Sequence, residues 1–338
     1  MEKKEAYWMK SPITGGAVYL CEGMETQTFR NEKFQVYVRY YECADTGGHF
    51  TTEDQDEQAF NELYNQYRVR HGIPFPDEIK RIRERYGLTL SQITEIVGFG
   101  QNQWRQYENG CVPSESNGKS IAAIKDRNGM LSMLSACKEQ LGDKKYEKIR
   151  NKVLCAPDSA NDDPLSVYFY GNTKRGIYNG FSEMNPDKLQ SMVQFIVSKE
   201  KNGVSKTKLN KEMFYADFCC YKKYGRSISG LSYRAIQYGP VPEHYETVYD
   251  HVQGLTKRNV SDNSDFDYDL FFCQEPDTSH LGKEDTDIIN EVMSVLAGMS
   301  RAEVVEMSHK ESAWENNGER HSLIPYSEAY KLAAFPCQ

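Results

Sequence analysis

Long apolar segments are missing from this chain. No stretch approaches the roughly 18 uncharged residues of a membrane-spanning helix, and residues 1–10 are charged and lack the apolar segment of a secretory signal. We therefore expect a cytoplasmic protein that contacts no membrane. Its 338 residues are enough for two or three domains, each with its own core.

Paired cysteines are missing as well. The nine cysteines are scattered, only Cys219 and Cys220 are neighbours, and no two have the C-x-x-C spacing. This pattern predicts reduced thiols, without a disulfide framework and without an intact zinc site.

The chain also has no excess of positive charge. Its 41 Lys and Arg stand against 49 Asp and Glu, which gives a formal net charge of -8. Any DNA binding must then depend on a local surface, and the acidic chain as a whole suits a basic protein partner.

Motifs of common enzymes are absent. The sequence contains no G-x-G-x-x-G fingerprint, no P-loop and no H-E-x-x-H. Ser308, His309 and Glu311 are close in sequence, but residues on one helix splay around its axis, whereas a catalytic triad is assembled from separate elements. His244 and His251 are interpreted as ordinary surface or core residues. We expect no enzyme, no catalytic residues, no cofactor and no bound metal.

Helix signals and stop signals alternate between residues 79 and 110. A first apolar run at helical spacing ends at Gly87, and a second follows the capping-box pair Thr89 and Gln92. A two-glycine turn separates the second run from a third helix at 101–109. Two short helices across a tight turn, with another helix before them, predict a helix-turn-helix.

The third of these helices carries the candidate DNA contacts. Trp104 and Tyr107 lie three residues apart and are expected to face the preceding helices. The side chains left to point outward are Gln101, Asn102, Gln103, Arg105 and Gln106. An amide can bond an adenine edge in a bidentate way, and an arginine can pair with guanine or phosphate. The alternative interpretation is a solvated helix face without function.

The segments I-R-E-R-Y-G-L-T-L-S-Q and G-Q-N-Q-W-R-Q-Y-E-N-G resemble the XRE-type helix-turn-helix of MqsA-like antitoxins. In that family an asparagine and an arginine of the recognition helix read the operator. Asn102 matches the first, whereas Gln106 stands where the arginine would be, which implies a different operator. The resemblance implies operator DNA as a partner and a homodimer paired through later helices; alternatively, residues 130–141 are only domain core.

Two turn-like knuckles lie before this motif, S-P-I-T-G-G from Ser11 and C-A-D-T-G-G from Cys43, with strand-like runs between them. They resemble the zinc ribbon that precedes the helix-turn-helix in the same antitoxins. Three of the four ligand positions have changed, to Ser11, Thr14 and Thr46, and only Cys43 remains. Because zinc needs four ligands, we expect the fold to persist without metal, held by aromatic packing. Cys21 and His49 as substitute ligands have no support from their spacing.

A stronger resemblance covers about residues 185–335. The segments L-N-K-E-M-F-Y-A-D-F, Y-G-R-S-I-S-G-L-S-Y, Y-G-P-V-P-E-H-Y, S-H-K-E-S-A-W and I-P-Y-S-E-A-Y follow in the order of the SocA-type antitoxin domain, also called Panacea. Members of that family neutralise very different toxins by direct binding, and the SocA branch can deliver its toxin to a protease. The motifs do not identify a toxin-binding surface, and most of their residues are expected to be structural.

These patterns predict a mainly α protein with small β parts. The expected domains are a zinc-ribbon-like domain with a connecting helix (1–72), the helix-turn-helix domain (73–141), a linker (142–184) and the SocA-type domain (185–338). Within the linker we expect a loop at 155–164. We also expect part of the span to dock on a neighbouring domain through its apolar and aromatic residues, which are Tyr168, Phe169, Tyr170, Ile177, Tyr178 and Phe181. Within the last domain we expect a helix at 243–255, and a strand at 231–237 that pairs with 269–273.

The expected function is that of an antitoxin that binds a cognate protein toxin and represses its own operon. One alternative is a transcriptional regulator that responds to a phage factor or a small ligand. Another is a proteolytic adaptor, which agrees with the family but has no support from a particular residue.

Overall fold

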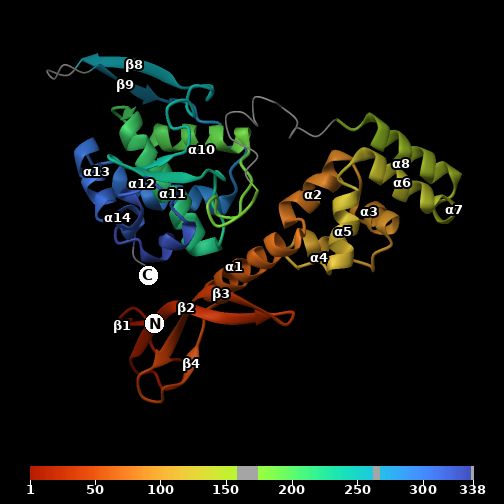
Figure 1. The fold of residues 1–338 in the computed structure, drawn as a ribbon, viewed down its shortest axis with the longest axis horizontal. Coiled ribbons are helices and arrows are strands. Elements are labelled where there is room, and N and C mark those ends of the chain that lie inside the picture. The colour runs from red at the N-terminus through yellow and green to blue at the C-terminus, as the bar shows by residue number, and fades with distance from the viewer. Residues whose placement is uncertain (158–173, 262–266, 336–338) are drawn as a thin grey trace. The chain divides into compact units, whose positions relative to one another are not determined.

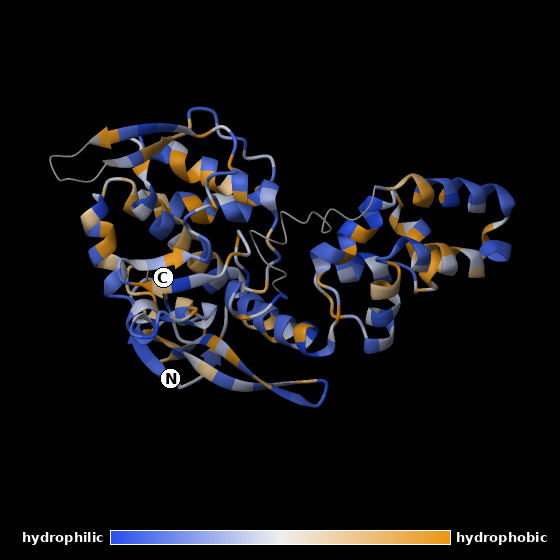
Figure 2. Ribbon diagram, turned by 45° about the horizontal axis from the view of Figure 1, so that its top comes forward, coloured by the Kyte–Doolittle hydropathy of each residue, from blue (hydrophilic) through white to orange (hydrophobic). Residues whose placement is uncertain are grey.

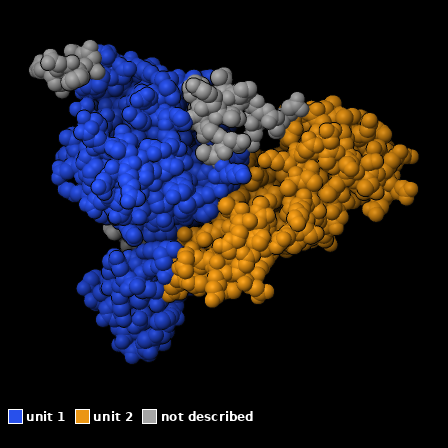
Figure 3. Space-filling view, viewed as in Figure 1, with its two compact units in different colours: residues 1–24, 37–59, 163–338 blue, residues 25–36, 60–162 orange. Residues whose placement is uncertain are grey.

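The computed structural model describes residues 1–157, 174–261 and 267–335. The fold is mainly α with small sheets, as predicted (Figure 1). It divides into unit 1, residues 1–24, 37–59 and 163–338, and unit 2, residues 25–36 and 60–162 (Figure 3). In the described ranges, no helix combines the length and the apolar character needed to cross a membrane.

A four-stranded sheet in the order β1-β2-β3-β4 begins the chain. Its strands are β1 (Glu2–Glu5), β2 (Val18–Phe29), β3 (Glu32–Cys43) and β4 (His49–Phe50). At the unit 1 end of the sheet, Ala6, Val18, Leu20 and Tyr41 form a small core. The far end of the β2–β3 hairpin, 25–36, belongs to unit 2.

Unit 2 is otherwise helical. Its elements are α1 (Glu53–His71, of which residues 60–71 fall in this unit), α2 (Pro76–Arg85), α3 (Leu90–Val97), α4 (Gln103–Glu108), α5 (Glu115–Ala123), α6 (Arg127–Ala136), α7 (Lys138–Leu141) and α8 (Asp143–Cys155). The predicted capping box of α3 is present, since Thr89 Oγ1 accepts from Gln92 N and Gln92 Oε1 accepts from Thr89 N. Gly98 ends α3 in the left-handed conformation, at φ 69°.

Two boundaries in unit 2 differ from the prediction. The third helix was expected from residue 101, but α4 begins at Gln103 because Asn102 adopts a left-handed backbone, at φ 65°. The linker was expected from 142, but α8 occupies 143–155, and its Ile149 and Val153 are fully buried in the core shared by α2 to α6. This stretch is mostly polar, but it has two buried apolar residues four positions apart on one face. These two residues are enough to pack the helix against the core.

The second half of unit 1 is built around α11 (Lys206–Tyr224), which is buried along most of its length. Around it lie α10 (Pro186–Lys199), α12 (Lys283–Leu296), α13 (Arg301–His309), α14 (Ser312–Gly318) and the 3-10 helix η2 (Tyr326–Lys331). Apolar side chains of these helices are buried, for example Leu189 of α10, Ile288 of α12 and Val304 of α13. Figure 2 shows hydrophobic and hydrophilic stretches alternating along the ribbon. Continuous burial explains why α11 shows apolar residues all round rather than on one stripe.

Two small sheets complete this part. β6 (Tyr233–Ile236) pairs with β7 (Gly239–Pro242), while β5 (Val204–Ser205), β9 (Asp267–Phe272) and β8 (Thr256–Ser261) form a second sheet in that order. The predicted pairing between 231–237 and 269–273 is therefore wrong. Each strand instead pairs with a near neighbour in sequence, β6 with β7 and β9 with β8.

The helix predicted at 243–255 is also absent, and successive turns replace it. His244 has a left-handed backbone, at φ 59°, and the following hydrogen bonds run from Thr247 N to His244 O and from Asp250 N to Thr247 O. A left-handed residue two positions after Pro242 prevents a regular helix from starting there. Of the residues expected to dock, Tyr168, Phe169 and Tyr170 lie outside the described residues, as does most of the loop at 155–164. Phe181 is buried and stacks on Tyr221 with ring centres 6.2 Å apart, whereas Tyr178 is exposed.

Candidate functional site

The α4 surface presents most of the predicted polar side chains. Gln101, Asn102, Arg105 and Gln106 are exposed. On the inner side of the same helix, Trp104 is completely buried and Tyr107 is buried. Within residues 1–157, 174–261 and 267–335, no side-chain hydrogen bond is recorded for the four exposed residues, so their polar groups face solvent. Their role in DNA binding stays a prediction.

Gln103 differs from its neighbours because its amide is used inside the motif. Its Oε1 accepts from Gly100 N at 3.0 Å, and its Nε2 donates to Tyr107 Oη at 2.7 Å. The side chain is only half-exposed. Gln103 therefore secures the start of α4, and we assign it a structural part in this surface.

A half-buried ion pair joins α4 to α2. Glu108 accepts two bonds from Arg83, at 2.6 Å from Nε and 3.0 Å from Nη2, and a third from Trp104 Nε1 at 2.8 Å. Hydrogen bonding to Glu108 raises the pKa of Arg83. Bidentate pairing of this kind restrains both the distance between the two side chains and their relative orientation. The orientation of α4 is thus set by contacts on its inner face, and its outer face is left free.

Charge is distributed unequally between the two units. Unit 2 contains 18 Lys and Arg against 15 Asp and Glu, whereas unit 1 contains 23 against 34. The formal net charges are therefore about +3 and about -11. Although the chain as a whole is acidic, unit 2, which contains α4, has a positive net charge. A positive charge is the sign expected of a DNA-binding unit.

The two knuckles of the sheet have the same backbone geometry. Ser11 N donates to Gly16 O and Cys43 N donates to Gly48 O, both at 2.9 Å. The hydrogen bonds from Gly15 N to Ser11 O and from Gly47 N to Cys43 O are both 2.8 Å long. Equal bonds in two loops 32 positions apart show that the loops are structural repeats of each other.

The knuckle side chains meet around one sulfur atom. Thr14 Oγ1 lies 3.4 Å from Cys43 Sγ, and hydrogen bonds from Ser11, Thr14 and Thr46 lower the pKa of Cys43 to about 6. Among the described residues, no group of three His, Cys, Asp or Glu is placed to hold a metal ion. The four positions that the resemblance assigns to zinc ligands thus lie together, but three of them carry hydroxyl groups.

A buried carboxylate organises the loop that follows α11. Asp217 accepts from Ile228 N and Ser229 N, both at 2.8 Å, from Tyr233 Oη at 2.7 Å and from Ser229 Oγ. It is fully buried, and desolvation raises its pKa. Gly230 lets the same loop pass close to Glu183, because a Cβ atom there would lie 2.7 Å from the Glu183 carbonyl carbon.

A second buried carboxylate joins the C-terminal residues to the same helix. Glu311 accepts from Tyr215 Oη at 3.2 Å, from Ala333 N at 2.7 Å and from Ala334 N at 3.0 Å. Its neighbours Ser308 and His309 have other contacts: Ser308 Oγ donates to Val305 O at 2.8 Å, and the His309 ring stacks on Trp314. The three residues examined as a triad therefore take part in separate interactions.

These two carboxylates lie in a region that matches a known family. Residues 209–315 match the family model described as antitoxin SocA-like, Panacea domain, and the Panacea domain below means this matched region. The match covers about a third of the chain, from α11 to α14, and supports an antitoxin role. It does not extend to the zinc-ribbon-like or helix-turn-helix parts. No curated protein and no solved structure matches the chain.

One charged residue of the Panacea domain has no counter-charge. Lys211 is 1% exposed, and no hydrogen bond or ion pair is recorded for its amine in the described part of the chain. The other buried lysines of α11 have partners: Lys208 Nζ bonds Glu200 Oε1 at 2.7 Å, and Lys222 Nζ donates to Phe335 O at 2.6 Å. Desolvation lowers the pKa of Lys211 to about 7.

The corner of the β6–β7 hairpin covers this lysine. A Cβ atom at Gly239, whose φ is 95°, would lie 2.8 Å from Lys211 Cε and 2.5 Å from Ser308 Oγ, so this close approach needs glycine. His309 lies nearby, and burial, together with the charge of Lys211, lowers its pKa. Three Panacea motifs thus meet at one point.

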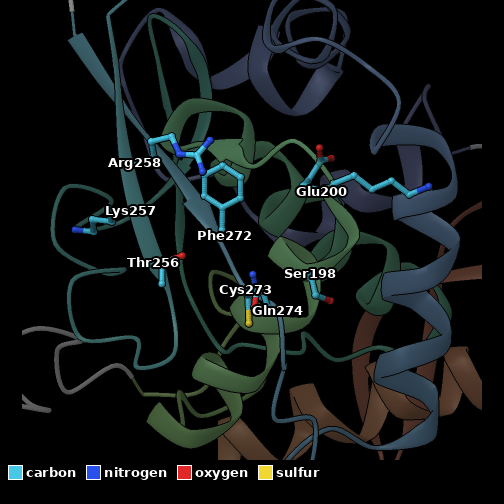
Figure 4. A pocket seen from close by; sticks show the side chains of 9 residues that line it. Ser198, Glu200, Thr256, Lys257, Arg258, Phe272, Cys273 and Gln274 are labelled. Carbon is cyan, nitrogen blue, oxygen red and sulfur yellow. The ribbon is translucent and has the colours of Figure 1, made fainter.

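A cavity of about 390 Å³ lies beside the β8–β9 hairpin (Figure 4). The Arg258 guanidinium lies over Phe272, 5.1 Å from the ring centre, whereas Lys257 points away from it and bonds Asp250 at 3.0 Å. Glu200, also on its wall, is paired with Lys208. Glu200, Lys257 and Arg258 therefore each contact a different neighbour rather than a common centre.

Proposed function

We propose that this protein is an antitoxin that binds and neutralises a co-encoded protein toxin and represses its own operon through α4. The observation that carries the antitoxin part is the Panacea match at residues 209–315. The operon-binding part is supported by the outward amides of α4 on a unit with net positive charge.

In this proposal, the opposite net charges of the two units assign toxin binding to unit 1 and DNA binding to unit 2. A negative unit attracts a basic protein and is repelled by DNA, while the positive unit is attracted to phosphate. Toxin bound to the Panacea domain would then alter repression by mass action, since the two ligands are linked through one polypeptide.

Co-expression with the product of the adjacent gene tests neutralisation. We expect that product to arrest growth alone, to be harmless when this chain is present, and to co-purify with it. An adjacent product that is harmless alone and never co-purifies would exclude the antitoxin role.

An Asn102→Ala variant provides the matched control for both functions. It should lose repression of a reporter behind the chain's own promoter while still protecting cells from the toxin, because Asn102 lies in unit 2 and the Panacea domain in unit 1. Loss of protection in this variant would show that the two functions are not separable as proposed.

A further inference from the structure

The segment that leaves the candidate recognition helix is held by two arginines from outside the helix-turn-helix. Arg30, at the tip of the β2–β3 hairpin, donates from Nη1 to Pro113 O and from Nη2 to Val112 O, both at 2.7 Å. Arg68 of α1 donates from Nη2 to Gly110 O at 2.5 Å. Three backbone carbonyls between α4 and α5 are thus bound by guanidinium groups.

The backbone at Arg30 is unusual for its residue type. Arg30 and Asn31 form the hairpin turn with φ values of 46° and 66°. Two-residue turns with two positive φ values favour Asn and Gly, and an arginine in the first position is disfavoured. Strained positions of this kind persist where the side chain has a task that compensates for them.

Aromatic rings orient the Arg30 side chain. Its guanidinium lies 5.0 Å from the centre of the Phe29 ring and 5.2 Å from that of Tyr67. These two rings contact each other edge-on, with centres 5.0 Å apart. The planar group is therefore stacked in one orientation, and its two outer nitrogen atoms reach two successive carbonyls.

A second set of contacts ties the same hairpin tip to the start of α5. Glu32 accepts from Arg70 Nη1 at 2.9 Å and lies 2.6 Å from His71 Nε2. The other ring nitrogen of His71 lies 3.5 Å from Glu115, in the first turn of α5. The hairpin tip thus contacts the later part of the 110–114 connection and, through His71, the start of α5, while α1 holds Gly110 through Arg68.

We infer that Arg30 is a positioning residue for DNA binding, which acts by fixing the segment after α4 and hence the direction in which Asn102 and Arg105 are presented. This inference rests on the proposed operator binding. Because both outer nitrogens of Arg30 are engaged by carbonyl oxygens, the residue sets geometry and does not contact phosphate. The hairpin thereby belongs to the DNA-binding body, although it comes from the sheet.

DNA-binding titrations of the full chain at several salt concentrations test the positioning role of Arg30. They use two duplexes, a fragment of the chain's own promoter and a scrambled fragment of equal length. For Arg30→Ala we expect affinity for the promoter to fall about tenfold, with affinity for the scrambled duplex and the salt dependence unchanged. Arg30→Lys keeps the charge but cannot bridge two carbonyls, so it should lose promoter affinity as well. Lys33→Ala removes a charge from an exposed position of the same hairpin and should match the unmodified chain.

Three outcomes would overturn the inference. Promoter affinity unchanged in Arg30→Ala shows that the clamp does not position α4. Equal losses on both duplexes, with a salt slope smaller by about one, identify Arg30 as a phosphate contact. Equal affinity of the unmodified chain for both duplexes removes the proposed function itself, and the inference with it. If the thermal unfolding curve of Arg30→Ala has lost its unit 2 transition, Arg30→Lys supplies the test, because its positive charge and aliphatic stem keep the packing on Phe29 and Tyr67 although it cannot bridge two carbonyls.

Discussion

Replacing Lys211 by Met should stabilise the Panacea domain and change how its stability depends on pH. Methionine has a similar unbranched shape and no charge to desolvate. The desolvated amine has a pKa of about 7 in the folded state against 10.5 in its ordinary state. This difference corresponds to about 4–5 kcal/mol that favours the unfolded chain when the lysine is protonated in both states.

The sign follows from proton binding. Between about pH 7 and pH 10.5 the unfolded chain holds a proton on Lys211 that the folded chain has released, so stability rises with pH across this window. Below about pH 7 both states are protonated and the penalty is complete. For Lys211→Met we therefore expect a gain of about 2–4 kcal/mol at pH 7, after local relaxation, that shrinks toward pH 10.

Urea unfolding followed by the fluorescence of Trp314, the single tryptophan within 209–315, measures this difference. The matched control is Lys208→Met, which removes a lysine that is paired with Glu200 at 2.7 Å and should destabilise the domain. If Lys211→Met is no more stable than the unmodified chain at pH 7, or if its advantage is the same at pH 10, the reasoning from burial is refuted.

Three further outcomes are expected. Asn102→Ala should weaken promoter binding by about 1–3 kcal/mol in a gel-shift titration, with little change on a scrambled duplex, because a base contact contributes only to specific binding. Combined Ser11→Cys, Thr14→Cys and Thr46→Cys substitutions should create a tetrathiolate site that binds one zinc or cobalt ion, seen in the cobalt thiolate absorption; absence of binding would contradict the repeat geometry of the knuckles. Asp217→Ala should destabilise the Panacea domain by about 3–5 kcal/mol in denaturant, since it leaves two backbone N–H groups and two hydroxyls without their acceptor.

Local signals in the sequence predicted local structure well. The Thr89 and Gln92 pair starts α3 and Gly98 ends it, because caps and left-handed glycines act within a few residues. The alternation of buried and outward residues around Trp104 was likewise visible in the spacing. The family resemblance at the C-terminal half located the Panacea domain, although the match is narrower than the predicted 185–335.

Features that depend on distant residues were missed. The Arg30 contacts span 82 and 83 positions, and nothing in the hairpin sequence indicates which carbonyls it meets. The burial of Lys211 was unexpected because lysine is read as a solvent-facing residue. The 243–255 segment has apolar residues at helical spacing, but the left-handed His244 decides its conformation, and backbone strain leaves no pattern in a single sequence.

Key polar residues of the Panacea motifs have structural contacts. Asp217 and Glu311 accept hydrogen bonds from groups within the domain, including the hydroxyls of Tyr233 and Tyr215. These four buried side chains have no free polar group to offer a partner. Under the proposed function, toxin recognition would therefore use exposed residues of the domain rather than these four. Substitutions at exposed positions of this domain should consequently change toxin binding without unfolding it, whereas substitutions in the motifs should do the reverse.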